Sequence, residues 1–178
     1  QNHKKEMKSV PKVNLRYKWI KMLNGKATTT AIKPTNRYNK HLDEFLSQSI
    51  STNVKINQEN LNKMKGIKTF NVIKASMKKP VGKEWDFKVV YFKGHTYSIV
   101  NSLNMVRKIK KSNANILSTF DKFTNEGSGW ILDEVIEMFV EAVIYKPLVG
   151  SSYKELPAII KNSKSCLNVQ NTDDRCFG

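Results

Sequence analysis

Hydrophobic and polar residues alternate along two neighbouring stretches in the middle of the chain. In residues 66–80 (GIKTFNVIKASMKKP) and 84–100 (EWDFKVVYFKGHTYSIV), β-branched and aromatic side chains recur at nearly every second position, which is typical of half-buried strands. Residues 80–82 (Pro-Val-Gly) lie between them as a turn region. The pattern predicts two antiparallel strands, and a bend at Lys93 and Gly94 would make the second stretch a hairpin of its own.

Apolar residues at helical spacing mark the clearest helix, over residues 101–125. One side of this segment is apolar and another is crowded with Lys and Arg, as expected of a helix packed on a core. The apolar side consists of Leu103, Val106, Ile109 (or Lys110), Leu117, Phe120 and Phe123 (or Thr124).

Two shorter segments nearer the N-terminus also carry a helical period. Residues 41–50 (HLDEFLSQSI) predict a short helix whose inward residues are Leu42, Phe45, Leu46 and Ser49 or Ile50. In residues 15–23 (LRYKWIKML), helical spacing relates Leu15, Trp19 and Met22 (or Leu23). The dipeptide Asn24-Gly25 then interrupts this pattern.

A long apolar segment, residues 130–148 (WILDEVIEMFVEAVIYKPL), follows a Glu-Gly-Ser-Gly break. Its periodicity fits a helix or a strand, and its Val and Ile content and Tyr-Lys-Pro exit favour a strand. The resulting β-β-α-β order predicts an α+β fold: a mostly antiparallel sheet with one long amphipathic helix packed on it. The expected organisation is a basic flexible arm (1–12), a helical or looped N-terminal part (13–65) and an α+β domain ending in a C-terminal hairpin (66–178).

Charge is the strongest global signal. Among 178 residues there are 31 Lys and Arg against 15 Asp and Glu, which gives a net charge of +16. Such a field attracts nucleic acid, acidic membrane surfaces, sulfated sugars or acidic proteins without choosing among them. Lysine enrichment from an AT-rich genome is the plainer explanation of this charge.

The hydrophobic fraction of 39% is enough for a core. The sequence contains no run of about 18 apolar residues, the length that predicts a membrane span.

The densest basic cluster lies on the predicted long helix. A helix carrying it would follow a phosphate backbone, and lysines at the strand ends would extend the surface; the alternative is a solvated helix face. The predicted basic surface consists of Arg107, Lys108, Lys110, Lys111, Lys78 and Lys79, with Lys83 and Lys93 as extensions. Base stacking would need exposed aromatic residues among these lysines, as in Tyr91-Phe92-Lys93, and strand alternation buries about half of such rings.

Acidic residues concentrate in one segment, at Asp133, Glu134, Glu137 and Glu141. Carboxylate clusters bind metals or perform acid–base chemistry, but no histidine accompanies this one. We expect salt bridges to the lysine-rich helix instead. The sequence has no zinc-ligand spacing, nucleotide-binding fingerprint or serine triad, and no cofactor is expected.

Cys166 and Cys176 are the two cysteines of the chain. Their even number and hairpin spacing allow a disulfide, which would stabilise the fold by about 2–3 kcal/mol. Two reduced thiols in a cytosolic protein are the other interpretation.

The residues from Gly127 onward form three motif segments. They are Gly127, Ser128, Gly129 and Trp130; then Tyr145, Pro147, Leu148, Gly150, Ser151, Ser152, Tyr153, Leu156 and Pro157; then Asp173, Cys176 and Phe177. The pattern resembles the N-terminal region, preceding the polymerase domain, of protein-primed family B DNA polymerases of Polinton/Maverick elements and adintoviruses. The resemblance implies an Asp-x-x-Cys motif like that of cysteine peptidases of the ovarian-tumour type, at Asp173 and Cys176.

In that family the chain continues past the cysteine with a tryptophan, a helix and, much later, a histidine. The present sequence ends two residues after Cys176. A thiolate nucleophile needs a base and is helped by a helix N-terminus, and neither follows here. We therefore expect a protein without enzymatic activity.

Two functional hypotheses from different classes follow. The first is a secreted, basic effector, a toxin or host-defence factor acting on other cells, domesticated or virus-borne and derived from the polymerase region. It depends on the first residue, Gln1 rather than Met, the absence of Asn-x-Ser/Thr sequons and a Cys166–Cys176 disulfide, and its partner would be an acidic cell-surface component or an unknown receptor. The alternative is an intracellular or nuclear nucleic-acid-binding module of a Polinton-like polymerase. A structural interaction domain is a third possibility.

Overall fold

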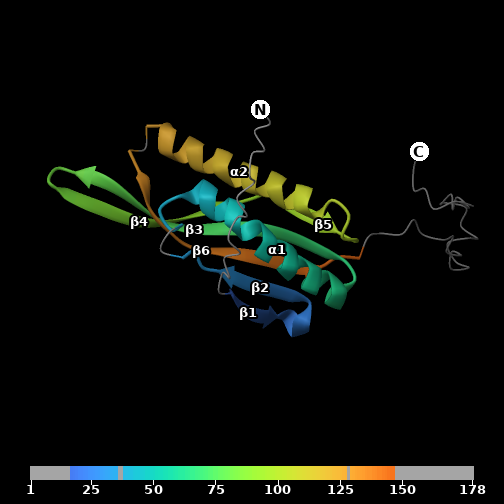
Figure 1. Ribbon diagram of the computed structural model, residues 1–178. Coiled ribbons are helices and arrows are strands. Elements are labelled where there is room, and N and C mark those ends of the chain that lie inside the picture. The colour runs from blue at the N-terminus through green and yellow to red at the C-terminus, as the bar shows by residue number, and fades with distance from the viewer. Residues whose placement is uncertain (1–16, 36–37, 128, 147–178) are drawn as a thin grey trace, which may run out of the picture. The chain divides into compact units, whose positions relative to one another are not determined.

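The computed structural model describes residues 17–35, 38–127 and 129–146 (Figure 1). The chain divides into two compact units, Gln1–Tyr145 and Lys146–Gly178. The second unit contributes only Lys146 to the described residues, and all described helices and strands belong to the first unit.

A six-stranded antiparallel sheet forms the centre of this unit. Its strands lie in the order β1-β2-β6-β3-β4. The short strand β5 pairs with the first residues of β3, and β4 pairs with the rest of β3. The strands are β1 (Tyr17–Met22), β2 (Ala27–Ile32), β3 (Ile67–Val81), β4 (Glu84–Lys93), β5 (Tyr97–Ile99) and β6 (Ile131–Ile144). A 3₁₀ turn (Leu23–Gly25) joins β1 to β2. The predicted α+β class with a mostly antiparallel sheet is confirmed.

Two helices, α1 (Leu42–Met64) and α2 (Met105–Asn125), lie on the same face of the sheet (Figure 1). Buried residues of β3 alternate with half-buried ones along the strand, as a sheet covered on one face requires. The larger core cluster joins Phe45 of α1 and Ile116 of α2 to Ile73 and Met77 of β3. A smaller cluster joins the opposite ends of the helices to β5 through Ile99.

Buried amides connect the helices to the sheet. Asn53 of α1 donates to Asn71 of β3 at 3.0 Å, and Asn71 donates to Asn113 of α2 at 3.2 Å. Asn113 in turn donates to the carbonyl of Leu46 at 3.3 Å. Because buried amides are costly unless hydrogen-bonded, this chain of contacts fixes the helices against β3.

The prediction of a helix around residues 15–23 is wrong, because residues 17–22 form strand β1. Tyr17 pairs with Ile32 and Met22 with Ala27 along β2. The segment YKWIKM fits both a helical and an alternating period, and the available edge of β2 decides between them. Residues 17–65 and 66–145 both contribute strands to one sheet, so the boundary expected at residue 65 falls between α1 and β3 of a single unit.

The helix predicted over residues 41–50 exists but continues to Met64. The predicted inward residues Leu42, Phe45, Leu46 and Ser49 are buried. Beyond them, the buried face of α1 contains Asn53, Asn57 and Asn60. These polar residues conceal the apolar period by which the rest of the helix would be recognised.

The bend predicted at residues 93–94 is present, but it does not produce a hairpin between β4 and β5. Both strands pair with the same edge of β3, β5 at Ile67–Thr69 and β4 at Val72–Val81.

A second difference concerns the start of α2, which lies at Met105. Leu103 and Val106, which were predicted to face inward, are exposed. The buried face of α2 begins with Met105 and Ile109. No described helix is long and apolar enough to cross a membrane.

Candidate functional site

The sheet face opposite α1 and α2 is covered by no helix of the described residues, as the two helices lie on one side in Figure 1. Register places Tyr91, Val89 and Phe87 of β4 beside Lys74, Ser76 and Lys78 of β3. Their neighbours along the strands, such as Phe92 and Ile73, are buried on the helix side. Side chains of a strand alternate between faces, so the first group lies on the open face.

Large apolar side chains are exposed in a row along β4. The exposed fractions are 51% for Trp85, 57% for Phe87, 50% for Val89 and 59% for Tyr91. The hairpin of β3 and β4 extends past the end of α2 (Figure 1), so neither α1 nor α2 covers the strand ends near the turn. Contiguous exposed apolar residues of this kind mark interaction sites.

Lysines border this row on β3 and at the end of β4. Lys78 Nζ lies 5.2 Å from the ring centroid of Trp85, and Lys93 Nζ lies 4.2 Å from that of Phe70. Both distances are within cation–π range, so the ammonium groups are held next to aromatic faces. We define the aromatic–lysine surface as Phe70, Lys74, Lys78, Trp85, Phe87, Val89, Tyr91 and Lys93.

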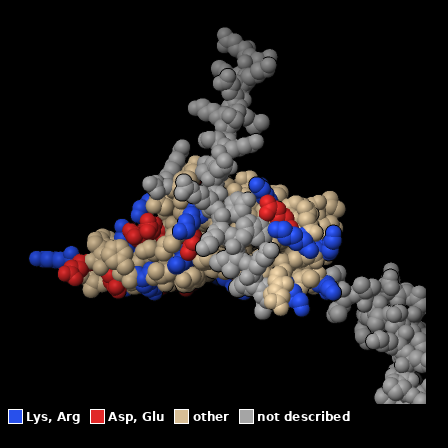
Figure 2. Space-filling model, turned by 90° about the horizontal axis from the view of Figure 1, so that it is seen from below, with Lys and Arg blue, Asp and Glu red and all other residues tan. Residues whose placement is uncertain are grey.

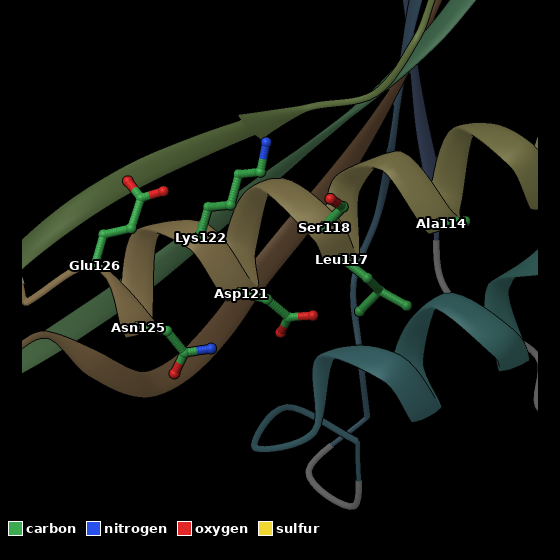
Figure 3. Close-up of a pocket in the computed structure, with 7 residues that line it drawn as sticks. All are labelled: Ala114, Leu117, Ser118, Asp121, Lys122, Asn125 and Glu126. Atoms are coloured by element: carbon green, nitrogen blue, oxygen red, sulfur yellow. The ribbon is translucent and has the colours of Figure 1, made fainter.

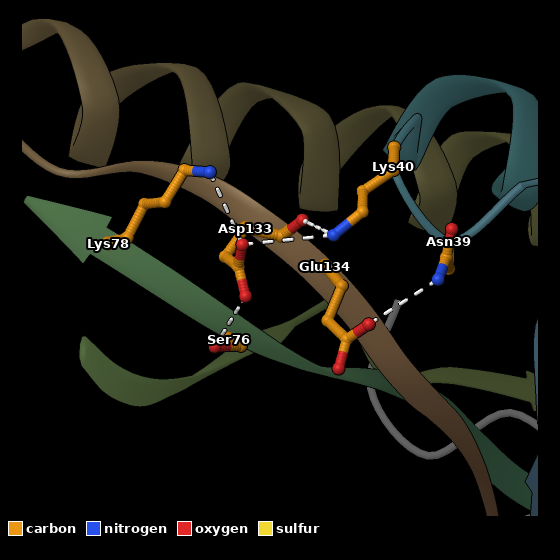
Figure 4. Close-up of polar contacts among 6 residues, drawn as sticks. All are labelled: Asn39, Lys40, Ser76, Lys78, Asp133 and Glu134. Carbon is orange, nitrogen blue, oxygen red and sulfur yellow. Dashed lines mark hydrogen bonds and ion pairs between the residues drawn. The ribbon is translucent and has the colours of Figure 1, made fainter. Parts of the chain in front are cut away.

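A β-bulge supplies the main carboxylate beside this surface. The register between β3 and β6 shifts between Ser76 and Met77, which leaves Asp133 without a strand partner. Asp133 accepts a hydrogen bond from Ser76 at 3.4 Å and forms ion pairs with Lys78 at 3.4 Å and Lys40 at 3.7 Å (Figure 4). Bulges commonly re-aim a side chain in this way.

The prediction that the acidic segment, now part of β6, forms salt bridges with the lysine-rich helix α2 is wrong. The partners come instead from β3 and from the segment before α1, and Lys74 pairs with Glu137 at 3.5 Å. Glu134 accepts from Asn39 (Figure 4), and Glu141 accepts from Thr29. The strand β6 neighbours β3 rather than α2 in the sheet. No group of three or more His, Cys, Asp or Glu within residues 17–35, 38–127 and 129–146 is arranged to hold a metal.

The predicted basic residues are divided between two ends of the unit. Lys78 and Lys79 lie near the β3–β4 turn, whereas Arg107, Lys108, Lys110 and Lys111 lie in the first two turns of α2, next to β5. The β5 partner Thr69 is nine residues from Lys78 along β3, or about 30 Å at the usual rise per residue. They therefore do not form the single patch that the sequence suggested.

Lysines and carboxylates are interspersed over the described surface that Figure 2 shows from below. On the open face, Lys74 and Lys78 pair with Glu137 and Asp133, so its charge is mixed and its distinguishing feature is the row of aromatic residues. Of that row, the sequence pointed only to Tyr91. The signal that would have found Trp85 and Phe87 is their position in an apolar alternation opposite to that of Phe92.

A shallow depression of about 550 Å³ lies along the C-terminal half of α2 (Figure 3). Its lining residues come from this helix and its C-cap residue Glu126, and include Asp121 and Lys122. Because the charges are mixed and no second element of the described residues closes it, this depression is not a convincing ligand site.

The described residues of the three motif segments named in the sequence have structural roles. Gly127 and Gly129 have φ angles of +73° and +67°, which favour glycine, in the turn before β6. Trp130 packs against the larger core cluster, with Lys88 Nζ 4.5 Å from its ring centroid. Tyr145 donates its backbone N–H to Gly66. Outside the described residues lie Pro147, Gly150, Ser151, Ser152, Tyr153, Pro157, Asp173 and both cysteines, Cys166 and Cys176.

Comparisons with protein-family models, with curated proteins and with solved structures give no match for this chain.

Proposed function

We propose that the protein binds single-stranded nucleic acid on its aromatic–lysine surface. The observation that carries this proposal is the row of exposed residues Trp85, Phe87 and Tyr91, next to Lys78 and Lys93. Proteins that bind single strands combine aromatic side chains, on which bases stack, with cations that meet the phosphates. Recognition of this kind needs no cofactor.

The spacing of the rings favours a single strand over a duplex. Alternate residues of a strand are about 7 Å apart, roughly twice the distance of 3.4 Å between stacked bases of one DNA strand. Bases that are separated from one another can each reach a ring, whereas bases stacked inside a duplex cannot. A flat sheet bearing aromatic residues is one common platform for unpaired bases.

Charge supports the same proposal at longer range. The chain carries a net charge of +16, which accelerates the approach of polyanions. Near the rings, Lys74 and Lys78 are only part-exposed and already paired with carboxylates. Aromatic stacking is therefore expected to contribute more of the affinity than phosphate contacts do.

The nucleic-acid hypothesis also agrees with the resemblance to the N-terminal region of protein-primed polymerases, which itself stays a prediction. The secreted-effector hypothesis stays a prediction as well, because its disulfide lies outside the described residues. No surface feature of the described residues favours a cell-surface receptor over nucleic acid.

The test is fluorescence anisotropy with a labelled single-stranded oligonucleotide of about 12 nucleotides, a length within the usual site size, and with a duplex of the same sequence. We expect the single strand to bind more tightly than the duplex. If Lys74, Lys78 and Lys93 meet phosphates, the slope of log K against log salt should be about −2. The triple substitution Trp85→Ala, Phe87→Ala and Tyr91→Ala should weaken binding by at least about tenfold.

Leu103→Ala is the matched control, because Leu103 is an exposed apolar residue outside the sheet. It should leave the affinity unchanged. Equal affinity for single strand and duplex, or an unaltered affinity of the triple variant, would reject the proposal. Self-association of the wild-type protein that the triple variant abolishes, without nucleic-acid binding, would identify the surface as a protein interface instead.

A further inference from the structure

A second polar site, which shares no residue with the aromatic–lysine surface, lies between the β4–β5 connection and the first turns of α2. It is a cleft of about 450 Å³. One wall is formed by His95, Thr96 and Tyr97, and the other by Arg107, Lys108, Lys111 and Ser112. The cleft thus gathers three permanent cations and an imidazole from two segments.

Short contacts fix the two walls against each other. Ser112 Oγ donates to the carbonyl of His95 at 3.2 Å, and Lys108 Nζ donates to the carbonyl of Ser98 at 2.6 Å. Gly94 packs so closely on α2 that a Cβ atom there would overlap the Ser112 hydroxyl. The cleft is therefore built into the fold and does not depend on a ligand to form it.

The cations of the cleft are not compensated within the described part of the chain. The ion pairs found there involve Lys40, Lys74 and Lys78, and none involves Arg107, Lys108 or Lys111. No carboxylate is among the residues that line the cleft. The first turn of α2 contains no acidic residue.

This placement opposes the stability of the helix. A helix N-terminus carries a partial positive charge, so cations in its first turns are unfavourable. Arg107 and Lys111, four residues apart, also repel each other. The N-cap residue Asn104 has a φ angle of 62° and forms no side-chain cap. Local violations of this kind are expected at functional sites.

We propose that this cleft binds the phosphate of an organic phosphomonoester. The planar guanidinium of Arg107 suits two oxygens of one phosphate, and Lys108 and Lys111 add point charges. The volume is in the range of small-molecule sites and leaves room for a nucleoside attached to the phosphate. Two sources share this chemistry: a free nucleotide and the phosphorylated end of a nucleic-acid strand. The proposal uses no residue of the aromatic–lysine surface and does not depend on the function proposed above.

The test is calorimetric titration of the full chain with AMP and with adenosine. We expect AMP to bind and adenosine not to bind, because the charge of the phosphate supplies the affinity. The double substitution Arg107→Gln and Lys111→Gln should weaken AMP binding by at least about tenfold, the usual effect of losing charge-assisted hydrogen bonds. Lys110→Gln is the matched control, since Lys110 belongs to the same basic run but does not line the cleft; it should change the affinity less than about twofold.

Thermal unfolding provides a second readout. The double variant should remain folded and unfold at the same or a slightly higher temperature than wild type, because repulsion at the start of α2 is removed. AMP should raise the unfolding temperature of the wild-type protein and not that of the double variant.

The two sources are separated with 5′-phosphorylated and 5′-hydroxyl oligonucleotides of one sequence. Tighter binding of the phosphorylated strand, reversed by AMP, would assign the cleft to strand ends; equal binding of both strands alongside AMP binding would assign it to free nucleotides. Absence of AMP binding to wild type together with no preference for the phosphorylated strand would overturn the proposal. So would a Lys110→Gln effect as large as that of the double variant, since the attraction would then be a diffuse charge effect.

Discussion

Asn71, in the middle of β3, donates a side-chain hydrogen bond of 3.2 Å to Asn113 of α2, and both amides are buried. The other side of the Asn71 amide accepts from Asn53 of α1. One strand residue therefore contacts both helices. The amide therefore adds two directional contacts to the apolar packing of α1 and α2 on the sheet.

Substituting Asn71→Ala should destabilise the fold by about 3 kcal/mol, because it leaves polar atoms of Asn53 and Asn113 buried without partners. Urea unfolding measures the change. Asn62→Ala is the control, since Asn62 is exposed on α1 and pairs only with Gln58 among the described contacts. A loss for Asn71→Ala no larger than that for Asn62→Ala would show that the amide network contributes little.

Gly94→Ala should destabilise the protein by about 1–3 kcal/mol, the usual cost of overpacking. The added Cβ would overlap Ser112 Oγ and lie 3.0 Å from the Ser112 carbonyl oxygen. Adding Ser112→Ala to this variant removes only the first of these contacts, so it should restore part of the loss. A double-mutant cycle by urea unfolding reports the coupling. Strictly additive effects would contradict this packing.

Asp133→Asn should lower the free energy of unfolding by about 1 kcal/mol, because Asp133 forms part-exposed ion pairs with both Lys40 and Lys78. The loss should shrink at high salt, which screens such pairs. Asp121→Asn, at an exposed position of α2, serves as the control and should be nearly neutral. An Asp133→Asn effect that is independent of salt would point to the Ser76 hydrogen bond rather than to the ion pairs.

Burial raises the pKa of the Tyr97 phenol above its ordinary value, and the Thr69 side chain lowers it by less. The folded protein keeps Tyr97 protonated at a pH where the unfolded chain ionises. The stability that this group contributes is therefore present below about pH 10 and is lost as the pH rises further.

The expected loss is about 1.4 kcal/mol for each pH unit above the ordinary tyrosine pKa. Urea unfolding at about pH 9 and about pH 11, on either side of that value, measures it. Tyr97→Phe should lose less stability between these two pH values than wild type does. Tyr91→Phe keeps Tyr97 and alters only an exposed ring, so it should behave like wild type. Equal losses in wild type and Tyr97→Phe would contradict the assignment.

Local periodicity was sufficient for the long elements of the α+β unit. Alternation in residues 66–80 and in the first part of 84–100, and the Val and Ile content of 130–148, predicted β3, β4 and β6, which the structure contains. The apolar spacing of 101–125 predicted α2 within four residues of its start. These segments are long enough that their repeat of apolar positions is clear even where single residues depart from it.

Periodicity failed where a remote partner decides the conformation. Residues 17–22 form a strand because β2 is there to pair with them. The second half of α1 buries Asn53, Asn57 and Asn60, which is tolerated where other buried groups, such as Asn71 and Thr28, supply hydrogen bonds. No local pattern contains those partners.

The candidate sites show the same division. The sequence by itself determined the alternation of β4, the basic run at the start of α2 and the net charge. Tertiary structure alone decided which face of β4 is buried: Phe92 packs edge-on against Phe120 and Phe123 of α2, at 5.4 and 5.6 Å between ring centroids, so Trp85, Phe87 and Tyr91 face outward. A period of two specifies that a strand has two different faces. Only the helix packed on one of them determines which face is left to bind.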